Sequence, residues 1–328
     1  MEDKKQEKYN NPFAATFTGI RDLFRKNEPS GELMASDRFD GKTVLVDGAS
    51  SGLGFAVSVE AARRGAKVIM ACRSGIPEKG EKVKKLTGSD KISMLNVDFS
   101  DLNSIRNLVG NIRDQFGKID ILICNAGIVP KKSRKTKQGV EEMFMVNYLS
   151  KFFFVNLLIH EDCFISGVDN VPRIIFVSSE AHRNPKEFDW DSFGIYKEYN
   201  IGKSVELYGY YKLLLTTYAV ELSRRLNRGD KPFSVLALCP GPINSNIGRE
   251  APKIFLPVLK LVFAIFFRSP KKAALPVIYL AASSDLEKKP FDYLFLMSRK
   301  EPSDNALLPA NGTKLWTLSE ELLVKIEG

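Results

Sequence analysis

From residue 41 onward, short apolar runs alternate with longer amphipathic stretches, and this alternation most limits what the chain can fold into. The apolar runs predict six strands, over residues 43–47, 67–72, 91–96, 120–124, 173–178 and 233–238. The stretches between them include four predicted helices, over residues 53–64, 101–116, 138–160 and 206–227. Strands that are apolar throughout and separated by helices are typical of a parallel sheet with both faces covered.

Right-handed crossovers connect such strands, so the sequence predicts an α/β fold with a doubly wound, Rossmann-type parallel sheet. The chain has 328 residues, of which 44% are apolar and 27% charged, and this suits one large soluble domain. We therefore expect a single domain over residues 41–328, preceded by an N-terminal extension over residues 1–40. No apolar run reaches the roughly 18 to 20 residues that a membrane span needs.

The N-terminal extension is polar except for one apolar stripe. Its first ten residues show no secretory signal. Four apolar side chains then recur at near-helical spacing, and they suit docking either on the domain or on a membrane: Phe13, Phe17, Ile20 and Phe24.

The four cysteines lie far apart in the sequence and form no CxxC pair: Cys72, Cys124, Cys163 and Cys239. We expect them to be reduced, buried thiols of an intracellular protein that faces the cytosol. With only two histidines in the chain, no metal site is expected.

The net charge is +9, and a cluster without any acidic residue contributes much of it: Lys131, Lys132, Arg134, Lys135 and Lys137. One interpretation is a solvated loop, and the other is contact with an anionic membrane surface such as that of the endoplasmic reticulum. Nucleic acid is not an expected partner, because no binding motif accompanies the charge.

The first predicted strand runs into a glycine-rich loop just before a predicted helix. Glycine permits a positive φ and lets the backbone approach a pyrophosphate bound at the helix N-terminus. We expect this loop to bind a dinucleotide through Gly48, Ser50, Ser51, Gly52, Leu53 and Gly54. A tight strand-to-helix turn without a ligand is the alternative.

The end of the second predicted strand indicates which dinucleotide is bound. NAD sites usually carry an acidic residue there, whereas this chain has Arg73, whose guanidinium suits a 2′-phosphate. The prediction is therefore NADP(H), unless Arg73 only extends into solvent at the sheet edge. Asp98 follows the third strand, where it is placed either to bind the adenine amine or to cap the next helix.

Tyr208 and Lys212 are four residues apart on a predicted helix, so their side chains share one face. A phenol has an ordinary pKa of about 10, and a nearby ammonium is expected to lower it enough for proton exchange. Tyr210 and Tyr211 have leucine four residues later and lack this partner. Such a pair also occurs without function on many surface helices.

Together these residues resemble the short-chain dehydrogenase/reductase family over about residues 41–320. The family's order of motifs is present in full, namely Gly48, Gly52 and Gly54, then Asn125-Ala126-Gly127, Asn147, Ser179, Tyr208-x-x-x-Lys212 and Pro240-Gly241. Arg73, the string from Val177 to His182 and the Leu315-Trp316 ending are most similar to the retinol dehydrogenase branch, which uses NADP(H) on retinoids and other lipophilic carbonyls.

The resemblance implies a role for each matching residue. Tyr208 would transfer the proton, Ser179 would hold the substrate oxygen and Lys212 would also hold the nicotinamide ribose. Asn147 would carry a proton relay through water, or form hydrogen bonds within the core. Further cofactor contacts are implied for Asn125, Ala126, Gly127, Pro240, Gly241, Ile243 and Ser245. Ser178 is expected to point away and to be structural.

Two residues depart from the family pattern. Asp47 stands where the family usually has Thr, and Cys124 where it usually has Asn. Because an acid beside a pyrophosphate is unfavourable, we expect Asp47 to point away or to serve a backbone donor. A non-catalytic protein that kept the sheet for cofactor binding or as a scaffold is the alternative that Asp47 leaves open.

An apolar segment over about residues 245–270 is expected to form the substrate lid. Such a lid suits a lipophilic substrate, and packing under the lid or an interfacial helix are the alternatives. The predicted function is NADP(H)-dependent interconversion of a lipophilic carbonyl and its alcohol. A hydroxysteroid or ketoacyl reductase of the same fold fits equally well, and a homodimer stays open.

Overall fold

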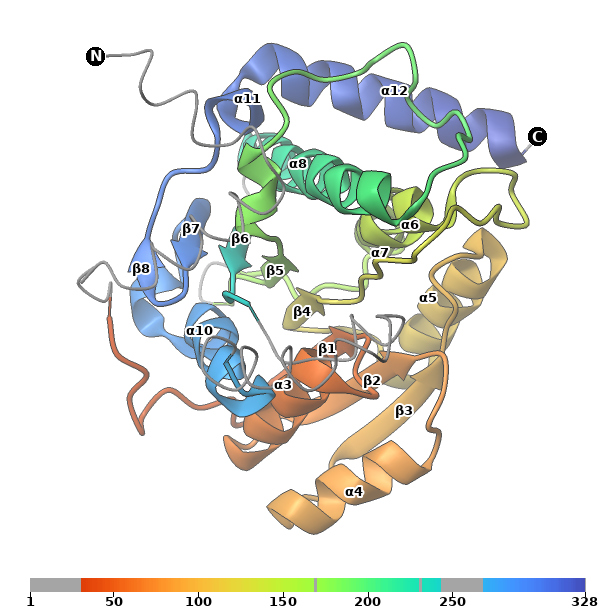
Figure 1. Cartoon of the computed structure of the whole chain (residues 1–328). Helices are drawn as coiled ribbons and strands as arrows, with labels where there is room; N and C mark the ends of the chain where they lie inside the picture. Colours follow the sequence, from red (N-terminus) through yellow and green to blue (C-terminus); the bar gives the residue numbers. More distant parts are fainter. Residues whose placement is uncertain (1–30, 168–169, 230–231, 243–267, 328) are drawn as a thin grey trace.

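The computed structural model describes residues 31–167, 170–229, 232–242 and 268–327. These residues form an eight-stranded sheet in the order β3-β2-β1-β4-β5-β6-β7-β8, parallel except for the last pair (Figure 1). The strands are β1 (Thr43–Asp47), β2 (Lys67–Cys72), β3 (Ile92–Asn96), β4 (Ile121–Cys124), β5 (Arg173–Val177), β6 (Ser234–Cys239), β7 (Phe291–Phe295) and β8 (Ser298–Arg299). The predicted α/β fold with a mostly parallel sheet is confirmed.

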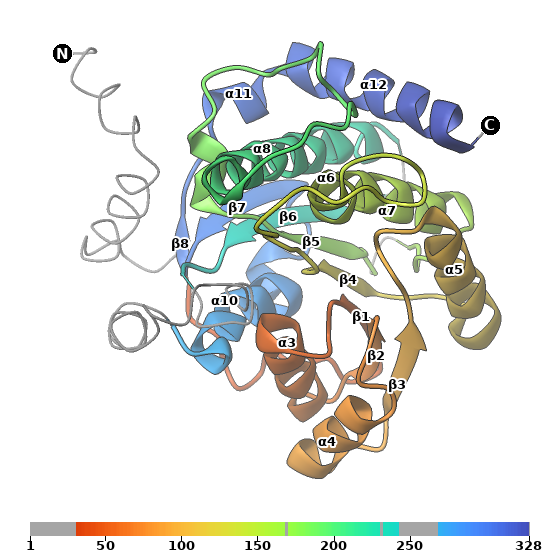
Figure 2. The same cartoon turned by 45° about the vertical axis from the view of Figure 1, so that its right-hand side comes forward.

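Helices cover both faces of the sheet (Figure 2). One face carries α5 (Leu102–Phe116), α7 (Ser150–His160), α8 (Ile201–Leu226) and α12 (Pro309–Glu327). The other carries α3 (Gly52–Arg63), α4 (Glu78–Thr87) and α10 (Pro270–Ala282). Shorter pieces are α6 (Glu142–Phe144), the π-helical turn η2 (Met145–Leu149), the 3₁₀ turns η3 (Glu180–Arg183) and η6 (Ser284–Leu286), and α11 (Asp304–Leu307).

The central strands are almost entirely apolar because both of their faces are buried. In β1, Val44 and Val46 belong to the core under α3 and α10, whereas Leu45 belongs to the core under α5, α7 and α8. Side chains of a strand alternate between faces, so a strand between two helix layers needs apolar residues at every position.

Several elements differ from the sequence-based expectation. Helix α8 begins at Ile201, five residues before the predicted start, because the side chain of Asn200 caps it by accepting from the Lys203 amide. The expected helix over 138–160 begins at Glu142, where Glu141 supplies the cap. Elements α4, α10, β7, β8 and α12 were not predicted.

The helical stretch Glu142–His160 is long and apolar enough to cross a membrane, although no single apolar run marked it as such. However, 72% of it is buried within the fold. Phe152, Phe154 and Leu158 pack in the core beside the sheet, so this stretch is a core helix.

The described end of the N-terminal extension packs against the domain. Phe39 is fully buried, and the Arg64 guanidinium donates to the carbonyls of Met34 and Asp37. The apolar stripe from Phe13 to Phe24 lies outside the described residues, as do residues 245–267 of the expected lid.

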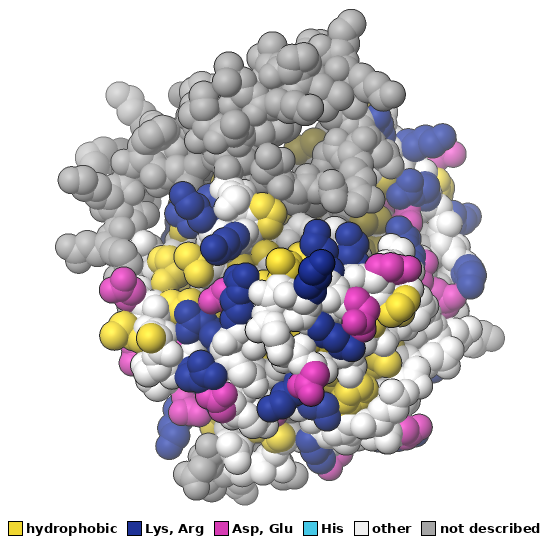
Figure 3. Space-filling view, turned by 90° about the horizontal axis from the view of Figure 1, so that it is seen from below, with side chains coloured by type: hydrophobic (Ala, Val, Ile, Leu, Met, Phe, Trp, Pro, Cys, Tyr) yellow, Lys and Arg dark blue, Asp and Glu magenta, His cyan; other side chains and the backbone are white. Residues whose placement is uncertain are grey.

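Surface charges of both signs are interspersed on the face seen in Figure 3.

Much of the basic cluster at residues 131–137 is paired within the chain. Arg134 forms an ion pair with Glu142, Lys137 lies 2.7 Å from Asp101, and Lys135 lies over the ring of Tyr196. This pairing favours the solvated-loop interpretation of the cluster over a membrane-binding one.

Candidate active site

Several of the predicted site residues follow the carboxyl ends of parallel strands. Strand β1 leads into the glycine loop, β4 into Asn125, β5 into Ser178 and β6 into Pro240. The neighbouring strands are in register up to these ends, with Cys124 beside Phe176 and Val177 beside Leu238. Ligands bind at this edge in open α/β sheets.

The glycine loop has the geometry of a dinucleotide cradle. Gly48 and Gly52 have φ values of 62° and 55°, which favour glycine. A Cβ on Gly54 would lie 2.5 Å from the Gly48 carbonyl oxygen. Among the described residues, Ser51 at the N-cap of α3 gives no side-chain cap, so the first helix amides point outward as an anion site. The loop therefore fits a pyrophosphate.

Asn125 joins the β4 end to this loop. Its side-chain amide donates to the carbonyls of Asp47 at 2.9 Å and Gly48 at 3.3 Å. The expected turn Asn125-Ala126-Gly127 is thus held against the glycine loop.

Asp47 points away from the glycine loop, as expected from the sequence. Its Oδ1 accepts from the backbone amides of Asn125, at 2.6 Å, and Ala126. Its Oδ2 lies 2.7 Å from Nζ of Lys151, and both side chains are at most 1% exposed. The acid is therefore neutralised inside the protein.

Asn147 lies on the π-helical turn η2 and is fully buried. Its side chain donates to the carbonyl of Ile128 at 2.9 Å and accepts from the same residue's amide at 2.8 Å. A Cβ on Gly127 would lie 3.3 Å from Asn147 Oδ1 and 3.9 Å from Lys212 Nζ, so these three residues adjoin. The core hydrogen bonds expected as the alternative for Asn147 are present.

Tyr208 and Lys212 share one face of α8, beside Ser179. Lys212 Nζ lies 5.7 Å from the centre of the Tyr208 ring and donates to the carbonyl of Val177 at 2.7 Å. Ser179 lies close enough to Tyr208 to lower the pKa of its hydroxyl. The structure thus brings the predicted Tyr, Lys, Ser and Asn residues to one end of the sheet.

Burial is the largest influence on the pKa values of Tyr208 and Lys212. It raises the pKa of Tyr208 to about 12, although Ser179 lowers it by a smaller amount. Burial also lowers the pKa of Lys212 to about 8, with Lys151 adding to this effect. The ammonium of Lys212 donates to the Val177 carbonyl, and burial is the largest influence on the pKa of Tyr208, so the expected lowering of that pKa by Lys212 stays a prediction.

The neighbours of Ser179 are structural. Ser178 Oγ lies 2.6 Å from Thr216 Oγ1, which agrees with its expected structural role. His182 is fully buried and forms hydrogen bonds with the Ser179 carbonyl and the Ser303 amide. Cys124 is also buried, and burial raises the pKa of its thiol well above the ordinary value.

Arg73 extends into solvent at the end of β2, with 66% of its side chain exposed and Asp98 3.8 Å away. Asp98 Oδ1 accepts from the amide and hydroxyl of Ser100, and the Asp98 amide donates to Ser104 Oγ. The alternative that Asp98 caps helix α5 is wrong, because Asp101 is the cap and accepts from the Asn103 amide.

The residues after β6 are described only in part. Pro240 is buried, and Gly241 has a φ of 78° and lies so close to Leu296 that a Cβ there would come within 2.6 Å of it. Ile243 and Ser245 lie outside the described residues.

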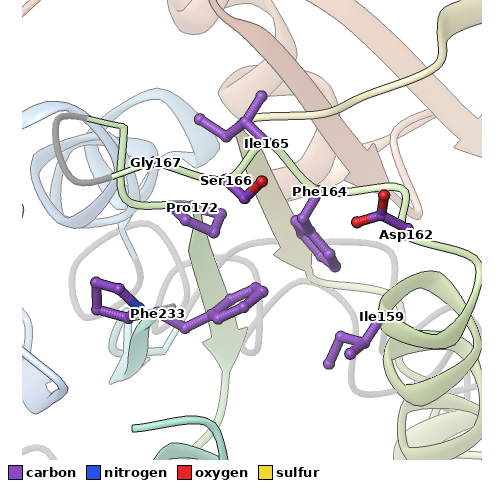
Figure 4. Close-up of a pocket in the computed structure, with 9 residues that line it drawn as sticks. Ile159, Asp162, Phe164, Ile165, Ser166, Gly167, Pro172 and Phe233 are labelled. Carbon is purple, nitrogen blue, oxygen red and sulfur yellow. The ribbon is translucent and has the colours of Figure 1, made fainter. Parts of the chain in front are cut away.

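A pocket of about 230 Å³ lies at the amino ends of the strands, opposite the predicted site (Figure 4). Its lining includes Phe164, Pro172 and Phe233, which stand at the amino ends of β4, β5 and β6. None of the predicted site residues that the structure describes is among its lining residues. Within the described ranges, no group of His, Cys, Asp or Glu side chains is arranged to hold a metal ion.

Known proteins resemble this chain over most of its length. The short chain dehydrogenase family model matches residues 42–189. Human retinol dehydrogenase 14 is 31% identical over 305 residues, covering 86% of either chain. The chain belongs to the short-chain dehydrogenase/reductase family. It is an oxidoreductase of the retinol dehydrogenase branch, and its family uses a nicotinamide cofactor.

Further relatives support this membership. Retinol dehydrogenase 13 of Mus musculus is 32% identical over 322 residues, 94% of this chain and 91% of that one. An uncharacterised protein from Mycobacterium paratuberculosis, of solved structure, has 29% identity and a TM-score of 0.67 over 89% of this chain and 97% of its own. A variant of a Serratia marcescens family member shares the fold, with 22% identity and a TM-score of 0.60 over 82% of this chain and 99% of its own.

Sequence reasoning missed two cationic residues near the site. Lys151 is a single charge in an otherwise apolar helix, and a buried lysine is rare unless it is paired, so this isolation was an available signal. Lys79 lies across Gly75, since a Cβ on Gly75 would be 2.7 Å from Lys79 Cγ and 3.7 Å from Ser50 Cβ. Nothing local distinguishes Lys79 from other lysines of α4.

Proposed function

We propose that this protein interconverts a lipophilic carbonyl and its alcohol with NADP(H), and that Tyr208 exchanges the proton. The observation that carries the proposal is the clustering of Tyr208, Ser179, Lys212 and Asn147 beside a glycine cradle. When bound, the dinucleotide supplies or accepts the hydride.

The chain's own residues would handle the oxygen and the proton. Ser179 would hold the substrate oxygen, and Tyr208 would give a proton to that oxygen or take it back. Lys212 is buried yet ionisable near neutrality, with a pKa of about 8, so it can favour the phenolate and hold the nicotinamide ribose. Asn147 would fix Ile128 and the turn that faces the cofactor.

The preference for NADP(H) rests on cations at the end of β2. Arg73 occupies the position where an acid would favour NAD, and its guanidinium is largely exposed. Lys79 has no ion pair within the described residues, and its side chain lies beside Gly75, which also adjoins Ser50. Two cations beside the glycine loop suit a 2′-phosphate.

Membership of the retinol dehydrogenase branch and the apolar sequence of residues 245–270 support a lipophilic substrate, such as a retinoid. We infer an intracellular site of action, since all four cysteines are free and buried. Peripheral contact with a membrane such as the endoplasmic reticulum would bring the enzyme to such a substrate.

The test is Tyr208→Phe, assayed with NADPH against retinal, steroid ketones, ketoacyl compounds and aliphatic aldehydes. Loss of the proton-exchanging hydroxyl should lower kcat/KM by on the order of 10²- to 10⁴-fold with NADPH affinity kept. Tyr210→Phe is the matched control, since Tyr210 lies on the same helix and bonds to Asp189 instead. Full activity of Tyr208→Phe, or no turnover of any panel member by the native protein, would refute the proposal.

A further inference from the structure

We propose that Asp47 and Lys151 form a positioning pair that holds the dinucleotide loop against the turn at residues 125–127 and keeps the buried surroundings of Lys212 electrically balanced. This proposal rests on the proposed function, because it concerns the same cofactor site. The proposal gives a structural role to Asp47, which stands where the family usually has Thr. It also gives one to Lys151, which is not part of the family motifs in this sequence.

The pair connects three segments of the site. Asp47 ends β1, and its carboxylate accepts from the Asn125 and Ala126 amides just after β4. Lys151 is the second residue of α7, one helical turn after Asn147, and its ammonium lies 2.7 Å from Asp47 Oδ2. The glycine loop, the β4 turn and the helix behind them are therefore fixed to one carboxylate.

Each partner requires the other. Both side chains are at most 1% exposed, and an unpaired charge at such a site is strongly unfavourable. Lys151 Nζ also lies 3.7 Å from the centre of the Phe99 ring, so an aromatic face further stabilises the cation. A threonine at position 47 would bond the backbone without a charge and would leave Lys151 unpaired.

The pair also acts electrostatically on Lys212. The groups that face Lys212 are Lys151 on α7, Cys239 on β6, Asp47 on β1 and Cys124 on β4, with Tyr208 on its own helix. Lys151 lowers the pKa of Lys212 and Asp47 raises it. Lys151 has the larger effect, so Asp47 offsets it only in part, and the loss of either one leaves the opposite charge acting alone.

The experiment compares Lys151→Met, Asp47→Asn and the double variant. Asn keeps an oxygen for the two amides, and Met keeps much of the lysine's length. NADPH affinity is measured by fluorescence titration from pH 6 to pH 10, and kcat/KM is measured over the same range. Lys118→Met is the control, because it removes an ion pair with Asp162 at the other sheet edge.

The two single variants should move the Lys212-dependent limb of the pH profile in opposite directions. In Lys151→Met the unpaired Asp47 should shift the limb upward by on the order of one pH unit, and in Asp47→Asn the unpaired Lys151 should shift it downward. Both should weaken NADPH binding by roughly tenfold as the loop loosens. The double variant should return towards the native profile and affinity.

Shifts of the same sign, or unchanged profiles in both folded single variants, would overturn the proposal. If the single variants do not fold, a folded double variant that keeps the native limb and affinity supports charge balance, and one that has lost them refutes it. If the native protein binds NADPH but turns over no substrate, only the proposed activity is refuted, because the binding titrations still test the role of the Asp47–Lys151 pair. If the native protein binds neither NADPH nor NADH, both proposals fail.

Discussion

On the 3₁₀ turn η3, which follows β5, the two ring nitrogens of His182 form different hydrogen bonds. Its Nε2 accepts from the Ser303 amide at 3.1 Å, so that nitrogen carries no proton. The proton therefore sits on Nδ1, which donates to the Ser179 carbonyl at 2.7 Å. A neutral imidazole thus fixes the backbone of Ser179, which the sequence marked only as part of a family string.

We predict that His182 makes stability depend on pH. Burial lowers its pKa from 6.5 to about 4, so the unfolded chain takes up the proton first as pH falls. The stabilisation is fully present above about pH 6.5 and is lost as pH falls towards 4, for a total of about 3 kcal/mol. Urea unfolding of the native protein and His182→Gln at pH 7 and pH 4.5 measures it.

The native protein should lose more stability over that range than His182→Gln, by about 2–3 kcal/mol. His160→Gln is the control, because the His160 side chain is 82% exposed and makes no such buried contacts. Parallel pH dependence in the native protein and His182→Gln would contradict the buried neutral imidazole.

At the scale of elements, the turn from β1 into α3 packs against the turn after β4. This contact has no room for a side chain at Gly54. A Cβ there would lie 2.5 Å from the Gly48 carbonyl and 2.6 Å from the side-chain amide of Asn125. Backbone on one side and a bonded amide on the other leave little freedom to relax.

Gly54→Ala should therefore separate the two turns and weaken dinucleotide binding. We expect a loss of affinity on the order of tenfold or more, because the groups that bind the dinucleotide would be moved out of position. Gly110→Ala is the matched control, since no heavy atom of the described residues lies within 4 Å of a Cβ added in α5. It should raise stability by about 0.5–1 kcal/mol because alanine favours the helix. Isothermal titration measures the dinucleotide affinity of each variant, and thermal melts measure its stability. An unchanged affinity in Gly54→Ala would contradict the prediction, because it would show that the loop accommodates the added methyl group.

The elements that sequence reasoning found are those with a local signal. Strands β1, β2 and β4 are short runs without polar interruptions, and their ends were predicted to within one residue. Helix α12 lacks a comparable signal. It is held by contacts with α8, including Trp316 over the guanidinium of Arg225 and against Tyr218. Such packing partners are distant in sequence and cannot be read from periodicity.

At the scale of the molecule, the strand order reverses between β1 and β4. From β1 the chain goes outward to β2 and β3, and from β4 it goes the other way (Figure 1). The crossovers on the two sides separate there, and ligands bind at this point in doubly wound sheets. Gly48 and Asn125, from the loops on either side of it, are in contact.

We predict that NADPH binding stabilises the whole domain and that Arg73 sets the preference. A ligand at 100 times its Kd adds about 2.7 kcal/mol, which raises the Tm by several degrees. NADPH should raise the Tm more than NADH does, and Arg73→Asp should reverse the order. Differential scanning fluorimetry at matched concentrations measures this.

Lys85→Asp is the control for that reversal, because Lys85 is an exposed lysine of α4 on the same side of the sheet. An equal shift by both nucleotides in the native protein, or an unchanged order in Arg73→Asp, would rule out Arg73 as the selecting residue.

The sequence by itself determined the strand ends, the glycine cradle and the Tyr208–Lys212 spacing, because each depends on residues within a few positions of one another. Only the tertiary structure decided how Asp47 is neutralised and how His182 is held. Their partners lie 104 and 121 residues away in the chain. Tertiary structure also sets the pKa of Tyr208, which burial raises, since burial depends on everything that packs around a group, and neighbours in sequence do not reveal it.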